Sequence, residues 1–213
     1  MPQDGFTALD FNCMRLPGLD ERMSAIREQI QPQFQRIADQ LIPFLNEKEQ
    51  ADPPFCAHIA RHARRTIHPP ESTWLALAQD KRGYKKHPHF QFGIWPSHLF
   101  FWLAFIDDYP HKKELGEAML TDMPTLMQTF PSYFAWSSDH TSADYALQGE
   151  LTANGLKQLL MRLTKVKKAE LLCGVVIPKQ EAITKSEEQL IAYLKEQILK
   201  LLPLYELALR STI

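Results

Sequence analysis

Eight consecutive apolar residues, from Leu99 to Ile106, constrain the fold of this 213-residue chain more than any other feature. A strand with one face in water alternates polar and apolar residues, whereas this run is apolar at every position and rich in aromatic rings. Such a run is typical of a strand that is buried on both faces. We therefore expect Leu99 to Ile106 to form the middle of a β-sheet.

The segment before this run has a period of two residues. From His89 to Trp95, apolar side chains at every second position alternate with His, Gln and Gly, as in a strand. Strands are also expected at Trp74–Ala78, after a short extended stretch at 55–60, and at Ala169–Ile177, which is rich in β-formers. Because short turns join the neighbouring strands, the pattern favours an antiparallel sheet.

Helices are expected on both sides of the strands in the sequence. Apolar residues spaced by four and three from Leu19 to Leu45 predict an amphipathic helix that covers the sheet and is interrupted at Pro32. A last helix follows the capping box of Ser186 and Gln189. Between them, helical spacing recurs at 112–130 and 145–163, with an extended stretch at 133–136. The sequence thus predicts one α+β domain over residues 1–213, with an antiparallel sheet and helices packed largely on one face.

The sequence also bears on the compartment. The start, MPQDGFTALDF, has neither the basic nor the apolar region of a secretion signal, and the longest apolar run is far shorter than the roughly 20 residues of a membrane helix. Three scattered cysteines without CxxC spacing argue against disulfides. We expect a cytoplasmic protein that does not bind membranes, and the oligomeric state stays open.

Positive charge is concentrated in the middle third of the chain. Of 24 basic and 25 acidic residues, seven basic and two acidic ones lie between Arg61 and Lys86, which leaves 17 and 23 elsewhere. Guanidinium groups bind two phosphate oxygens at once, lysines add point charges, and aromatic rings can stack on a base. The residues expected to bind a phosphate-bearing ligand are Arg61, Arg64, Arg65, Trp74, Arg82, Tyr84, Lys85 and His89.

Other interpretations of the same residues stay open. The cations could pair with acidic residues or face water, and adjacent Arg64 and Arg65 would point to opposite faces of a strand. Histidine pairs one turn or two residues apart suit a metal, but no HExxH motif or cysteine ligand accompanies them, so neither a metal nor a cofactor is predicted. Asp139 beside His140 could orient an imidazole as a general base, or could satisfy a turn.

Several long motifs of the chain are unusual, namely FTALDF (6–11), GLDERMSAI (18–26), HARRT (62–66), PPESTW (69–74), KRGYKKHPHFQFGIW (81–95) and WSSDH (136–140). Together they resemble the YktB-like family of uncharacterised bacterial proteins. The chain departs from the family pattern at His68 and at Glu71-Ser72, where Asn and Asn-Asp are expected. The resemblance covers the chain up to about Ile177. It assigns no catalytic residue to this sequence, because no catalytic residues are known for the family.

The resemblance implies an α+β fold with an antiparallel sheet, akin to the catalytic fold of biotin ligases and class II aminoacyl-tRNA synthetases. Those enzymes hold ATP with an arginine-bearing strand–loop–strand, and Trp74 to Trp95 independently fits a strand, a cationic loop and a strand. The leading hypothesis is binding of a nucleotide or a nucleic-acid segment. The alternatives are a nucleotide-dependent group-transfer enzyme and a structural or partner-binding protein.

Overall fold

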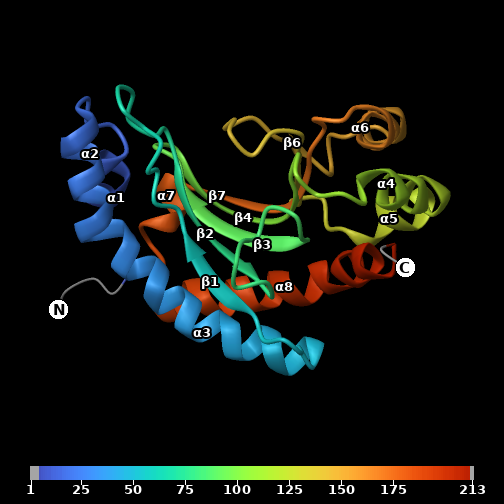
Figure 1. The fold of residues 1–213 in the computed structure, drawn as a ribbon, viewed down its shortest axis with the longest axis horizontal. Helices are drawn as coiled ribbons and strands as arrows, with labels where there is room; N and C mark the ends of the chain where they lie inside the picture. Colours follow the sequence, from blue (N-terminus) through green and yellow to red (C-terminus); the bar gives the residue numbers. More distant parts are fainter. Residues whose placement is uncertain (1–4, 212–213) are drawn as a thin grey trace.

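The computed structural model describes residues 5–211, which are organised around one seven-stranded sheet (Figure 1). The strand order is β1-β2-β3-β4-β7-β5-β6, and every neighbouring pair is antiparallel, as predicted. The bounds are β1 Cys56–Ile59, β2 Thr73–Ala78, β3 His89–Ile94, β4 His98–Phe105, β5 Ala135–Ser137, β6 Ala146–Leu147 and β7 Leu171–Pro178.

The helices lie mainly below the sheet and beyond its two ends (Figure 1). The bounds are α1 Ala8–Cys13, α2 Leu19–Ala25, η1 Ile26–Ile30, α3 Gln31–Glu49, α4 Lys112–Thr121, α5 Met123–Thr129, α6 Ala153–Lys165, α7 Lys179–Ala182 and α8 Glu187–Arg210. Helix α3 contacts β1 and β2, and α8 contacts β4 and β7, so these two long helices cover the lower face. Helices α4 and α6 pack on each other near the β5–β6 end.

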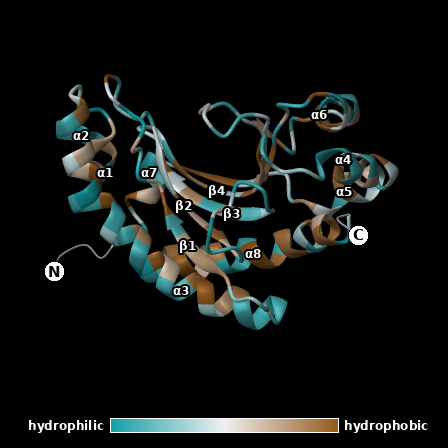
Figure 2. Ribbon diagram, viewed as in Figure 1, coloured by the Kyte–Doolittle hydropathy of each residue, from teal (hydrophilic) through white to brown (hydrophobic). Residues whose placement is uncertain are grey.

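The lower face carries the main hydrophobic core. Phe92 of β3 lies opposite Phe101 of β4 and Leu75 of β2, and all three side chains are fully buried. The ring of Phe92 meets Phe34 of α3 edge to face, with 5.7 Å between ring centroids. Burial of each such ring stabilises the fold by about 1.5–3 kcal/mol. Figure 2 shows that hydrophobic residues are concentrated in the strands and along α8.

The opposite, upper face carries Trp74, Gln91 and Trp102, which the strand register places on one side of β2, β3 and β4. Loops 60–72 and 138–145 lie above this face (Figure 1). Gly93 is required here because a Cβ at this position would lie 2.3 Å from the ring of Phe100 and 2.6 Å from the Thr73 carbonyl oxygen. The upper face is therefore an aromatic layer that is largely buried, in which Trp74 is half-buried and loops lie above.

Most of the predicted elements are present. Strand β4 is the fourth of seven and is buried along its whole length, which confirms the prediction from the apolar run. The expected interruption at Pro32 is also confirmed, because α2 and α3 are joined by the π-helical turn η1 and Pro32 lies in the first turn of α3. No helix within residues 5–211 combines the length and apolarity that crossing a membrane requires.

One predicted element is wrong in its first half. Residues 145–163 were expected to be helical, but Ala146–Leu147 pairs with β5, and α6 begins only at Ala153. The side chain of Thr152 accepts a hydrogen bond from the Gly155 N–H at 3.0 Å and fixes this later start. The apolar spacing of residues 145–151 reflects packing beside the sheet instead of a helix face.

Candidate functional site

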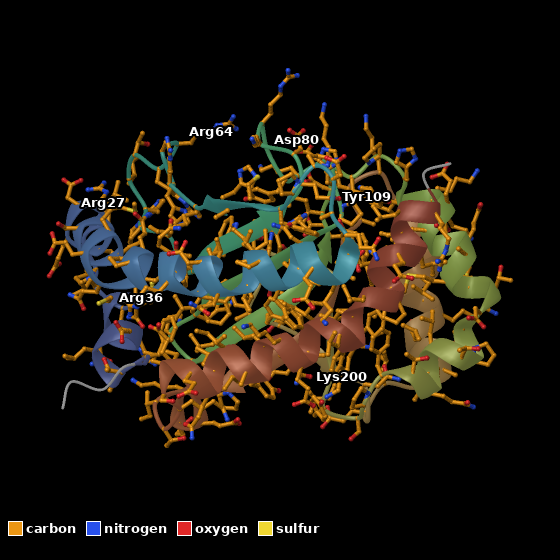
Figure 3. The ribbon with its side chains drawn as sticks, turned by 90° about the horizontal axis from the view of Figure 1, so that it is seen from below. Arg27, Arg36, Arg64, Asp80, Tyr109 and Lys200 are labelled. Carbon is orange, nitrogen blue, oxygen red and sulfur yellow. The ribbon has the colours of Figure 1, made fainter. Side chains whose placement is uncertain are left out.

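A hollow of about 1150 Å³ runs along the edge strand β1, and we call it the edge depression. It is lined by residues 56–61, by residues 80–87 of the loop between β2 and β3, and by Gln35 and Asp108. Because β1 ends the sheet, one side of this hollow faces solvent. Asp80, which lines it, lies at one margin of the molecule, well away from Arg27 and Lys200 (Figure 3).

Five cations line the edge depression, and we call them the cationic rim. They are Arg61, Lys81, Arg82, Lys85 and Lys86. All five are exposed, and none forms an ion pair with a carboxylate of residues 5–211. The lining contains only two carboxylates, Asp80 and Asp108. Its formal charge is therefore positive when the histidines are counted as neutral.

Asp80 shapes the loop that carries four of these cations. Its carboxylate accepts the Arg82 backbone N–H at 2.8 Å and contacts the His87 ring nitrogen at 3.2 Å. These hydrogen bonds and the charges of His87 and Arg82 lower the pKa of Asp80 from its ordinary value. The aspartate therefore satisfies turn donors, as is common at loop positions, and leaves the side chains of the cations unpaired.

Aromatic rings form the inner wall beside the cationic rim. The ring of Tyr84 lies 4.7 Å from that of His89 and 5.6 Å from that of His58, centroid to centroid. Its hydroxyl accepts a hydrogen bond from Trp74 Nε1 at 3.0 Å. Burial raises the pKa of Tyr84, so the phenol stays neutral at physiological pH. Tyr84 thus joins the edge depression to Trp74 on the upper face.

The eight residues predicted to bind the ligand occupy different surroundings. Arg61, Arg82, Tyr84 and Lys85 line the edge depression, and Trp74 lies next to it through its hydrogen bond to Tyr84. By contrast, the exposed Arg64 and Arg65 lie in loop 60–72, outside the lining of the hollow. Figure 3 shows Arg64 at the same margin of the molecule as Asp80.

His89 is a buried residue of the sheet. It is 0% exposed, and burial lowers its pKa to about 3, so the ring is neutral. One ring nitrogen, Nδ1, lies 2.8 Å from the His87 carbonyl oxygen, which requires a proton on Nδ1, and Nε2 lies 2.9 Å from the Gln91 amide nitrogen. Both nitrogens are therefore satisfied within the protein, and a ligand cannot reach them.

His58, Lys81 and Lys86 line the edge depression although they were not among the eight predicted residues. His58 lies on β1 opposite Ala76, and its Nε2 contacts the Asp80 carbonyl oxygen at 3.0 Å. The neighbouring Cys56 thiol donates to the Ala78 carbonyl oxygen at 3.2 Å, and burial raises its pKa. A thiol with a raised pKa is a poor nucleophile, so this pair does not indicate cysteine catalysis.

A second polar cluster lies across Trp74 from the edge depression. The His140 ring is 6.0 Å from the Trp74 ring, and its Nδ1 lies 2.7 Å and 2.9 Å from the two carboxylate oxygens of Glu170. The backbone N–H groups of His140 and Asp107 also donate to Glu170, at 2.8 Å and 3.2 Å. Burial alone would raise the pKa of Glu170, but the hydrogen bonds from His140 lower it below its ordinary value.

The acid that orients His140 is therefore Glu170 and not the adjacent Asp139. Asp139 accepts hydrogen bonds from the backbone N–H and the hydroxyl of Thr141, at 2.7 Å and 2.6 Å, which is the turn role that the sequence favoured for it. Glu170 was missed because it is 30 residues from His140 in sequence. The only sequence signal was one acidic residue at the start of a buried strand.

A buried lysine fixes the backbone around Glu170. Lys112 Nζ donates to the carbonyl oxygens of Asp107, Lys167 and Ala169, at 2.6, 2.7 and 3.0 Å. These carbonyls belong to the segments that leave β4 and enter β7, so one ammonium group joins two distant parts of the chain. Burial lowers the pKa of Lys112.

Asp139, His140 and Glu170 could also offer three ligand atoms to a cation, since these atoms lie within 4.8 Å of one another. A cation on His140 would need the lone pair of a ring nitrogen and a carboxylate turned toward it. Instead, His140 Nδ1 lies at hydrogen-bond distance from both oxygens of Glu170, and Asp139 is bonded to Thr141. The geometry favours a hydrogen-bonded carboxylate–histidine pair.

Comparison with known proteins finds one family and close bacterial relatives. A family model described as a domain of unknown function, DUF1054, matches residues 6–205. A UPF0637 protein of Bacillus licheniformis is 40% identical over 208 residues, 98% of each chain. UPF0637 proteins of Shouchella clausii and Oceanobacillus iheyensis are 44% and 42% identical, over 99% and 98% of this chain and 98% of theirs. The similarity thus includes the whole of the site.

Proposed function

This chain belongs to the DUF1054 family, whose description states no activity, and we propose that its edge depression binds a phosphate-bearing ligand. The observation that carries the proposal is the cationic rim, in which five basic side chains surround one hollow and lack carboxylate partners within residues 5–211. Like charges held together repel one another, and a bound polyanion would relieve that repulsion. We also propose that the protein is cytoplasmic and forms a single domain, as expected from the sequence.

The hollow is open to solvent on one side, so a ligand bound in it would contact the protein with only part of its surface. The volume of the hollow, about 1150 Å³, is slightly above the range typical of small-molecule pockets, roughly 300–1000 Å³, and the edge of the sheet leaves it open. Arg61 and Arg82 can each bind two phosphate oxygens, whereas the lysines add charge. Tyr84 and Trp74 supply rings for stacking against a base, which contributes about 1–3 kcal/mol per base where it occurs.

Binding measurements on a matched pair of variants test this proposal. Titrations with ATP, AMP and inorganic phosphate, and fluorescence anisotropy of a labelled single-stranded oligonucleotide, separate a nucleotide site from a nucleic-acid site. The double variant Arg82→Ala/Lys85→Ala should bind about 5- to 30-fold more weakly, since two exposed ion pairs together contribute at most about 2 kcal/mol. The control Arg27→Ala/Lys113→Ala changes two exposed cations outside the edge depression.

The thermal midpoint should be nearly the same for the protein and both double variants, because the exchanged rim side chains are exposed and unpaired and the control loses only the exposed pair of Lys113 with Glu117. Equal affinity in the rim variant and the unchanged protein, or binding of none of these probes, would refute the proposal. Preference for ATP over the oligonucleotide would indicate a nucleotide ligand, and the reverse would indicate a nucleic-acid segment.

A nucleotide-dependent group-transfer enzyme is the second candidate. It is favoured by the antiparallel pair of β2 and β3 with the cationic loop between them, the arrangement expected from kinship with biotin ligases and class II aminoacyl-tRNA synthetases. That kinship stays a proposal and rests on analogy of fold. Saturable ATP consumption that Arg82→Ala abolishes would support it, and ATP binding without turnover would count against it.

A further inference from the structure

We infer that His140, oriented by Glu170, is a general base that acts on a phosphodiester bond of single-stranded nucleic acid bound along the cationic rim and past the half-buried Trp74. This inference rests on the proposed function, because the cationic rim is the part that holds the strand. It adds a chemical step to binding and assigns that step to residues outside the edge depression.

The first support is the geometry of the carboxylate–histidine pair. Glu170 is 8% exposed and receives hydrogen bonds from the His140 ring, the His140 backbone and the Asp107 backbone. A carboxylate held by three donors stays ionised, and it keeps the proton of the neutral imidazole on Nδ1. The lone pair of the other nitrogen, Nε2, then points away from Glu170 and is available as a proton acceptor.

The second support is the accessibility of that nitrogen. His140 Nε2 has no hydrogen-bond partner within the part of the chain that the structure describes. In the same part, no buried side-chain nitrogen or oxygen lacks a partner, so the unpartnered Nε2 is not fully buried, and the His140 side chain is 16% exposed. His89, by contrast, is fully buried, and His98 is only 6% exposed.

The third support is a row of rings that joins His140 to the cationic rim. The His140 ring contacts Trp74, Trp74 bonds to Tyr84, and the Tyr84 ring lies 5.6 Å from His58 in the edge depression. The base and the rim are therefore several rings apart, which is too far for one phosphate group to touch both. An extended strand that carries bases for the rings and phosphates for the rim matches this spacing, whereas a mononucleotide does not.

The step is a hydrolysis and needs no further reactant. His140 Nε2 accepts a proton from a water molecule as the water oxygen forms a bond to phosphorus. The bond from phosphorus to one ester oxygen breaks, and the resulting imidazolium returns the proton to that leaving oxygen. The products are one strand with a terminal phosphate monoester and one with a terminal hydroxyl, and His140 is regenerated.

Two variants separate this role from a structural one. His140→Gln removes the base, whereas Glu170→Gln keeps the packing but turns an amide donor toward Nδ1, which moves the ring proton to Nε2. A general base typically contributes 10²–10⁴-fold, so both variants should lose at least about 100-fold in cleavage. Glu170→Asp, which keeps the charge, should recover part of the rate. Binding of the oligonucleotide should stay within about 2-fold in all three.

The assay follows cleavage of a fluorophore–quencher-labelled single-stranded oligonucleotide, in DNA and RNA forms, and release of nitrophenolate from bis(p-nitrophenyl) phosphate. If the unchanged protein binds the oligonucleotide but cleaves none of these probes, the inference is overturned and the proposed function stands. Cleavage by His140→Gln at the normal rate overturns it as well. If ATP, AMP or phosphate binds but the oligonucleotide does not, the inference is overturned and the proposed function stands. If none of these probes binds, the proposed function falls and the inference falls with it.

Discussion

The salt dependence of nucleic-acid binding measures how many rim cations contact phosphate. Neutralising phosphates on a single strand releases counterions, so log affinity falls with log salt concentration at about 0.7 per contact. Five rim cations set an upper slope of about 3.5, which corresponds to roughly a 100-fold loss of affinity between 50 and 200 mM salt. The double variant Arg82→Ala/Lys85→Ala retains three cations and should give a slope of about 2 and a loss of roughly 20-fold.

The measurement is a series of anisotropy titrations of one labelled oligonucleotide at four or more salt concentrations. The control Arg27→Ala/Lys113→Ala should keep the slope of the unchanged protein, because neither side chain lines the edge depression. Identical slopes for the rim variant and the unchanged protein would refute the reasoning, even if the affinities differed. A slope below about 1 for the unchanged protein would mean that the five cations do not act on one ligand.

Four further predictions concern the fold. Because burial lowers the pKa of His89 to about 3, its neutral ring favours the folded state fully above the unfolded value near 6.5, and this contribution is lost as pH falls. Between pH 6 and 5, His89 should account for about 1 kcal/mol of the fall in the free energy of unfolding measured with urea, beside similar losses from His62 and His98, so that His89→Gln should lose about 1 kcal/mol less than the unchanged protein. Gly174→Ala would bring a Cβ within 2.0 Å of a backbone oxygen of β4 and should cost at least about 1–3 kcal/mol in urea unfolding, whereas Gly83→Ala meets nothing within 4 Å and should change little. Ser186→Ala removes the cap of α8 and should lower the unfolding free energy by about 0.5–2 kcal/mol, with an unchanged circular dichroism spectrum as the check on folding. Lys112→Met should destabilise by more than about 1–3 kcal/mol, since several buried carbonyls lose their donor; an unchanged melting temperature would contradict this.

The sheet was predictable because local patterns report burial directly. The run from Leu99 to Ile106 identified the central strand, and the alternation from His89 to Trp95 identified its neighbour. Residues 145–151 were misassigned because apolar spacing over so short a stretch does not distinguish a helix from a bridge and turn.

The candidate site was only partly predictable, because it depends on contacts between segments that are distant in sequence. Composition identified the loop around Arg82, but it could not show that Arg64 lies outside the edge depression or that His89 is enclosed in the sheet. The pairing of His140 with Glu170 is set by the adjacency of β5 and β7, a feature of topology that no local pattern contains.

The ammonium group of Lys112 joins the segment that leaves β4 to the segment that enters β7, through the carbonyl oxygens of Asp107 and Ala169. Ala169 precedes Glu170 in sequence, and the Asp107 backbone N–H donates to the Glu170 carboxylate. Glu170 directs the His140 imidazole, and Lys112 of α4 fixes the backbone beside that carboxylate without a hydrogen bond to the imidazole itself. A search for the residues that control the position of this ring should consequently include Lys112, whose contacts lie in the backbone that carries Glu170.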